Sequence, residues 1–177
     1  MKTLKLIVTI AFASLVNAAP SLAQNPKLTD PEIASVAVVA NQIDISYADI
    51  AKEKSKDKEV LNFANTMATD HAAIIAKASA LVKKLNVTPK DNALSQKLLK
   101  GSDETKKQLR GKSGKDFDKA YIDNEVAYHK AVISTVKDVL IPQAQNKELK
   151  DLLQSVLPAL QAHLSHAEMV QKNFSGK

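Results

Sequence analysis

Apolar residues recur along this chain at spacings of three and four, the pattern of helices that bury one face. Four stretches carry such a stripe, and they cover about residues 30–52, 55–86, 115–140 and 146–173. No stretch shows the strict alternation of apolar and polar residues that is typical of a strand. The sequence therefore predicts an all-α protein.

Turn and capping signals fall between these stretches. Thr29 and Glu32 have the spacing of a capping box at the start of the first helix, and Asp57 can cap the second. Pro142 is expected to close the third helix. Pro158 lies inside the fourth, where it should produce a kink by removing one backbone hydrogen bond.

Residues 87–114 differ from the rest because their apolar stripe is thin. We expect a short helix over about 93–110, within a crossover that links two helical hairpins. Short turns make the neighbours within each hairpin antiparallel. The predicted fold is thus a four-helix bundle, made of two antiparallel hairpins and one long crossover that contains a short helix.

The beginning of the chain has the features of a signal peptide. Two lysines precede a short apolar run, and small residues then lead to a predicted cleavage between Ala23 and Gln24. We therefore expect residues 1–23 to be removed, residues 24–29 to be disordered, the bundle to span 30–173 and a tail to follow at 174–177. The mature chain has no apolar run long enough to cross a membrane. Its predicted location is the periplasm or cell envelope.

Composition narrows the chemistry. The chain has no cysteine, which excludes disulfide scaffolds, thiol catalysis and iron–sulfur clusters. It also lacks the Gly-x-Ser-x-Gly turn of hydrolases and any phosphate-binding glycine loop. We therefore expect a non-enzymatic protein.

Five ionisable side chains interrupt the apolar stripes, with at least one on each long helix. The number of residues between each side chain and the nearest turn, multiplied by the helical rise per residue, gives its depth along the bundle axis. By this estimate, four of the five side chains lie within about 6 Å of one level. A buried group of this kind must pair, bind an ion or change its protonation. The five residues are Asp44, His71, Glu125, His129 and His163.

Two interpretations of this cluster are open. The one that we favour from the sequence is a structural hydrogen-bonded network, in which the carboxylates hold the histidines. The alternative is one mononuclear transition-metal site for zinc, iron, manganese or copper. A copper variant of this site uses His163, His166 and Met169 at successive spacings of three, with Met67 one turn before His71, because imidazole and thioether groups together favour Cu(I). Asp70, next to His71, is a further candidate, which gives three secondary candidates in all. They are Asp70, His166 and Met169.

The crossover is strongly basic. Its six central cationic residues are Lys97, Lys100, Lys106, Lys107, Arg110 and Lys112. The preferred interpretation is a solvated surface, and the alternative is attachment to an anionic envelope surface. Nucleic acid is not expected as a partner, because these cations are almost all lysines and no aromatic residue accompanies them.

Four ordered phrases carry a family resemblance: Asp70-His71, Phe117-Asp118-x-x-Tyr121, His129, and Leu157-Pro158-x-Leu160-x-x-His163. In these the chain resembles an exported bacterial family, domain of unknown function 4142, of the ferritin-like superfamily. The resemblance implies the fold and the compartment but no reaction. The chain departs from the di-iron pattern of ferritin-like proteins because it has no Glu-x-x-His motif.

Overall fold

The computed structural model describes residues 27–175, and within that range it contains helices and no strand. The elements in chain order are α1 (Asp30–Lys54), α2 (Lys58–Lys84), α3 (Ala93–Arg110), α4 (Gly114–Thr135), η1 (Val136–Leu140), α5 (Ile141–Gln143) and α6 (Lys147–Ser175). The all-α prediction is confirmed.

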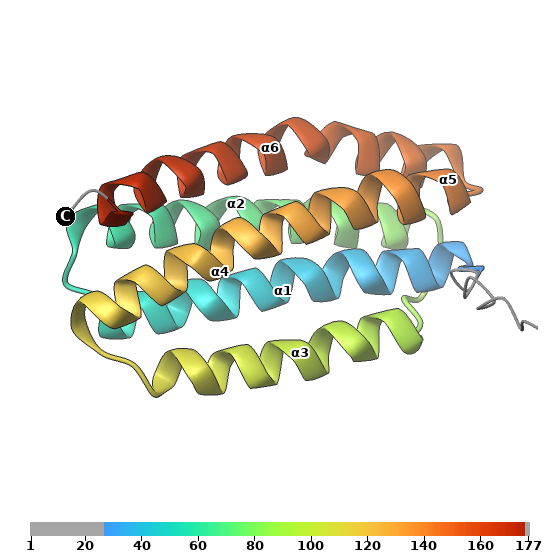
Figure 1. Ribbon diagram of the computed structural model, residues 1–177. Coiled ribbons are helices and arrows are strands. Elements are labelled where there is room, and N and C mark those ends of the chain that lie inside the picture. Colours follow the sequence, from blue (N-terminus) through green and yellow to red (C-terminus); the bar gives the residue numbers. More distant parts are fainter. Residues whose placement is uncertain (1–26, 176–177) are drawn as a thin grey trace, which may run out of the picture.

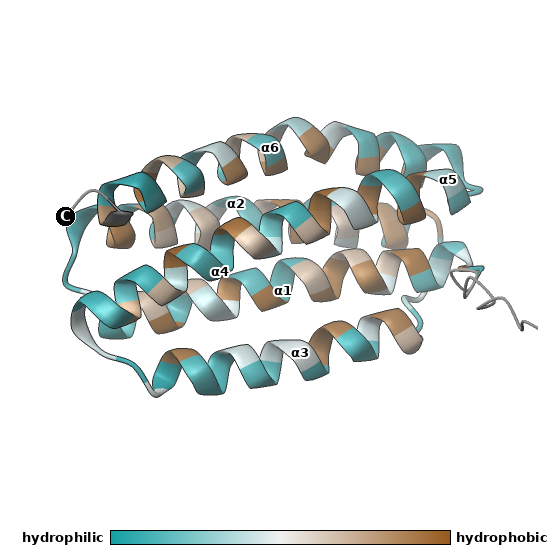
Figure 2. Cartoon of the chain, viewed as in Figure 1, coloured by the Kyte–Doolittle hydropathy of each residue, from teal (hydrophilic) through white to brown (hydrophobic). Residues whose placement is uncertain are grey.

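The four long helices pack along one another with their axes roughly parallel (Figure 1). α1 and α2 form one antiparallel hairpin, and α4, continued by η1 and α5, forms the other with α6. Apolar residues lie mainly on the faces that the helices turn toward one another, while polar residues cover the outside (Figure 2). Burial of these faces supplies the main driving force for folding.

The core consists of two apolar clusters, one toward each end of the bundle. The first includes Phe63 and Tyr121, and the second includes Leu140 and Leu153. On α2, α4 and α6, a single buried histidine separates the residues of one cluster from those of the other. The sequence thus places a polar layer across the middle of an otherwise apolar core.

α3 lies alongside α1, on the outside of the four long helices (Figure 1). Its bounds match the short helix expected over 93–110. The face that it turns inward is narrow and partly polar, with Ser95, Ser102 and Leu109 buried. This narrow face explains why α3 packs on the outside of the bundle, with Leu109 as its fully buried apolar contribution to the first core cluster.

The capping signals work as predicted. The Asp57 carboxylate accepts hydrogen bonds from the backbone N–H groups of Glu59 and Val60, at 2.8 and 3.2 Å. The Glu32 carboxylate accepts from the backbone N–H of Thr29 at 2.9 Å, which is one half of the capping box.

Proline has different effects in the two helices of the second hairpin. The helix begun by α4 does not end smoothly at Pro142, because a five-residue π-helical segment, η1, comes before it. There the N–H of Ile141 donates to the carbonyl of Val136, five residues back. α6 runs without a break through Pro158 and follows a gentle arch (Figure 1).

The predicted signal peptide, its cleavage position and residues 24–26 lie outside the described residues. Within the segment 24–29, expected to be disordered, Leu28 is in fact only 4% exposed. Its backbone N–H donates to the Gln143 side chain at 2.6 Å, so this end of the segment is ordered. Among the described helices, none combines the length and apolar character that a membrane span requires.

Candidate metal centre

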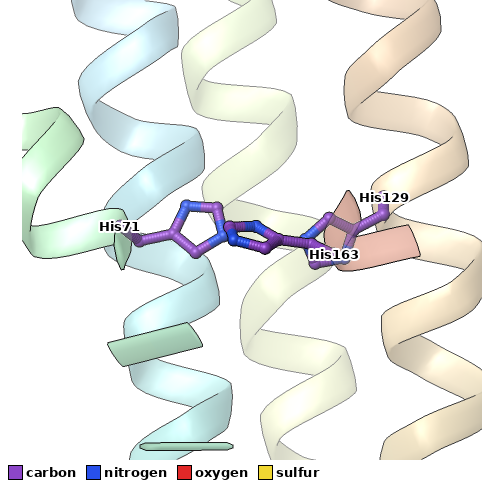
Figure 3. Close-up of side chains that lie close together, drawn as sticks. All are labelled: His71, His129 and His163. Carbon is purple, nitrogen blue, oxygen red and sulfur yellow. The ribbon is translucent and has the colours of Figure 1, made fainter. Parts of the chain in front are cut away.

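Three histidines from three helices meet in the middle of the bundle. His71 comes from α2, His129 from α4 and His163 from α6, and their rings point toward one another at one level (Figure 3). The ring centroids are 5.7 Å apart for His71 and His129, 5.1 Å for His71 and His163, and 5.5 Å for His129 and His163. All three side chains are buried.

One ring nitrogen of each histidine is held by an oxygen of the protein. His71 Nδ1 lies 2.7 Å from the side-chain oxygen of Asn41. His129 Nδ1 lies 3.0 Å from the backbone carbonyl of Glu125, and His163 Nε2 lies 3.0 Å from the carboxylate of Asp70. An oxygen of these three kinds accepts a hydrogen bond, so each of these nitrogens carries the proton.

The orientation of the Asn41 amide is itself fixed. Its Nδ2 donates to the carbonyl of Ala37 at 2.7 Å, which leaves Oδ1 to face His71. Because the proton of a neutral imidazole is on one nitrogen, the other nitrogen has a lone pair. The hydrogen-bond partners therefore set the tautomer of all three rings.

The three remaining nitrogens face the centre of the cluster. They are His71 Nε2, His129 Nε2 and His163 Nδ1, and each is buried without a hydrogen-bond partner among the described residues. One ligating atom from each ring lies within 4.8 Å of the other two. A point equidistant from three atoms at this spacing lies about 3 Å from each of them. Small side-chain rotations would therefore bring the ligating atoms to the roughly 2 Å of a metal–nitrogen bond.

Two buried carboxyl groups complete the cluster. Asp44 Oδ2 lies 3.4 Å from His71 Nε2 and 3.6 Å from His129 Nε2, and Glu125 Oε2 lies 3.6 Å from His129 Nδ1. These separations exceed those of good hydrogen bonds, and all four carboxyl oxygens lack a partner among the described residues. Asp44, Glu125 and His129 form a second group with ligating atoms within 4.8 Å of one another.

Burial controls the charge of these groups. Desolvation, helped by the neighbouring histidines, lowers the pKa of His71 to about 3, and desolvation lowers that of His129 to about 4. Desolvation raises the pKa of Asp44 to about 8, and it raises that of Glu125, where the adjacent Asp44 adds to the effect. Near neutral pH His71 and His129 are thus in the uncharged form that binds metals.

Residues 16–170 match the sequence profile of a family described as Domain of unknown function (DUF4142). The chain belongs to this family. The resemblance predicted from the four phrases is thereby confirmed, whereas membership in the ferritin-like superfamily stays a prediction.

This DUF4142 protein is also similar in fold to a solved structure, "CopM in the Cu(II)-bound form". The two share 16% sequence identity with a TM-score of 0.61, and the match covers 82% of this chain and 98% of the other. At this identity the likeness concerns the fold alone. No curated protein matches the chain.

The secondary candidates in this DUF4142 protein have different positions. Asp70 contacts the cluster from its edge through His163. His166 packs edge-on against Phe63, with ring centroids 5.1 Å apart, and Met169 is 57% exposed. The spacing of three residues turns these side chains toward different neighbours, so the structure does not bring Met169 to the three histidines.

The predicted basic residues do not belong to the cluster. Five of the six are exposed on α3 or directly after it, and the sixth, Lys106, pairs with Asp103 at 2.8 Å. They are therefore spread over an outer surface.

The sequence interpretation did not identify Asn41, although it fixes the tautomer of His71. The available signal was a polar residue three positions before Asp44, on the same side of α1. The three tyrosines were also missed as neighbours of the site. The ring centroid of Tyr128 is 6.3 Å from that of His129 and 5.5 Å from that of Tyr47.

Proposed function

We propose that this protein binds one divalent transition-metal ion through His71, His129 and His163. The observation that carries the proposal is a set of three buried histidines that offer ligating atoms within 4.8 Å of one another, each with one unpartnered ring nitrogen and the other nitrogen held by an oxygen. Metal-ligating histidines almost always donate their other N–H in this way.

The structural network favoured from the sequence accounts for less of this geometry. In such a network the carboxylates would hold the histidines, but Asp44 makes no hydrogen bond to either histidine beside it, and both Glu125 oxygens lack a partner. A buried polar group without a partner costs about 1–3 kcal/mol. A cation among these groups would satisfy several of them together.

Copper is the first candidate among the metals. Imidazole ligands suit copper and zinc, and the general affinity order of divalent ions peaks at Cu(II). The fold neighbour in its Cu(II)-bound form supports the same choice. Asp44 and Glu125 are placed to supply negative charge near the ion. The bound ion would act as a cargo or storage ion held in a desolvated site, within an exported protein of the cell envelope.

Metal stoichiometry tests the proposal. Mature protein is expected to retain about one equivalent of Cu(II) after gel filtration, as measured by elemental analysis. His163→Ala should lose it, because one of three converging nitrogens is removed, whereas His166→Ala, on the same helix but outside the cluster, should retain it. Less than about one-tenth of an equivalent in the unsubstituted protein would contradict the proposal.

The hydrogen bond from His71 to Asn41 gives a second prediction. Asn41→Leu removes the acceptor that fixes the ring tautomer, and loss of such an outer contact lowers metal affinity by about 10- to 100-fold. Competition with a chelator of known affinity measures the change. Gln42→Leu is the control, because the Gln42 side chain is next to Asn41 on α1 but is exposed. Equal losses in both variants would contradict the role of Asn41.

The basic surface of α3 supports a second candidate function, attachment to an anionic envelope surface. The exposed lysines are expected to bind vesicles of anionic lipid at low salt and to release them as the Debye length falls below about 10 Å. Sedimentation of the protein with vesicles across a salt series measures this. Binding that is absent, or insensitive to salt, would exclude this function.

A further inference from the structure

A cavity of about 120 Å³ lies inside the bundle, directly beside the metal centre. Its walls are mostly apolar side chains of α1, α2, α4 and α6, such as Ala37, Ala78, Val132 and Val156. The cavity is partly open to solvent.

The cavity is long. Its walls extend along α1 from Ala34 to Asp44, a span of about 15 Å at the rise of an α-helix. An engineered cavity of about 150 Å³ holds the six carbons of one benzene molecule, so this volume encloses roughly five non-hydrogen atoms, and its open mouth leaves room for the end of a slightly longer chain. The shape favours a linear chain over a ring.

One end of the cavity is polar. Asp44, His71 and His129 line it there, and their unpartnered atoms are the two Asp44 oxygens and the Nε2 atom of each histidine. All four atoms can accept hydrogen bonds, and a proton on Asp44 would serve only one of them. The group that this end recognises in a ligand is therefore a hydrogen-bond donor.

We propose that this cavity binds a short primary alcohol, with an alkyl chain of about six carbons along the apolar walls and its hydroxyl group donating to Asp44. The site lies beside the proposed metal position and differs from it in chemistry, since the alkyl chain would contact walls that are mostly apolar. The alcohol does not require the metal, because both Asp44 oxygens are available as acceptors in the metal-free protein.

The test compares two isomers on metal-free protein kept in a chelator: 1-hexanol and pentyl methyl ether. Both have six carbons and one oxygen, but only the alcohol donates a hydrogen bond. Methyl NMR titration with labelled alanine is expected to show 1-hexanol binding at least about tenfold more tightly, because the ether leaves the buried acceptors unsatisfied. Equal affinities, or no binding of either compound, would overturn the proposal.

Three variants locate the ligand. Ala78→Leu fills the cavity from α2 and should weaken 1-hexanol binding at least about tenfold, whereas Ala72→Leu, an exposed position on the same helix, should not change it. Asp44→Leu should bring the affinities of the two isomers to within about twofold. A full effect of Ala72→Leu, or an unchanged preference in Asp44→Leu, would contradict the assignment. Because no metal is present, failure of copper binding leaves this result unaffected.

Discussion

His129→Ala is expected to remove most of the stabilisation that Cu(II) gives to the unsubstituted protein. His129 is the one residue common to both groups of ligating atoms, so its loss affects each of them. An ion present at about 1,000 times its dissociation constant stabilises a folded protein by about 4 kcal/mol. Without His129, we expect the affinity for Cu(II) to fall by roughly 100-fold or more. This loss exceeds the one expected when a hydrogen-bond partner of a ligating histidine is removed.

Chemical denaturation with and without Cu(II) measures this effect. The chain has three tyrosines and no tryptophan, and all three are close to the cluster or to one another. Paramagnetic Cu(II) should therefore quench the tyrosine fluorescence, which gives an independent binding signal. His166→Ala serves as the control. If His129→Ala kept both the quenching and the stabilisation, the proposed centre would be wrong.

Asp44→Asn is expected to make the metal-free protein more stable at alkaline pH. Burial raises the pKa of Asp44 to about 8, while the unfolded chain has a pKa of about 4 at this residue. The folded state thus keeps a proton that the unfolded state releases, and stability is lost as pH rises from about 4 to 8. Asparagine resembles the protonated acid but does not titrate, so the variant avoids a cost of several kcal/mol.

The difference between the two proteins should be small near pH 4, grow with pH and level off above pH 8. Urea denaturation in the presence of a chelator, repeated at several pH values, measures it. The lowered pKa values of His71 and His129 affect both proteins alike and therefore cancel to first order. Asp49→Asn is the control, because its carboxylate is 55% exposed on the same helix. A constant difference across pH would contradict burial of an ionisable Asp44.

These two predictions describe one conflict between stability and binding. The groups that would hold an ion, Asp44 and Glu125 among them, are the same groups whose burial is unfavourable without one. A protein selected only for stability would replace them with apolar side chains of similar size. Their presence in the centre of the bundle is what a binding function would require.

The prediction of the helices succeeded because their signals are local. Capping residues such as Asp57 act within three positions, and the apolar stripes determine which face is buried. The prediction was incomplete near Pro142, because the π-helical segment η1 comes directly before α5, the short helix that contains this proline. Which irregular turn precedes a proline depends on how the flanking residues pack, and the sequence does not specify this.

The sequence by itself determined that His71, His129 and His163 are on buried faces at one level, since the helical rise and the turn positions are enough to calculate this. Only the tertiary structure decided which nitrogen of each ring faces inward. That choice depends on Asn41, Asp70 and the Glu125 carbonyl, two of them 30 and 93 residues away from their partners. A hydrogen bond between distant segments forms only after the helices have packed, so no local pattern encodes it.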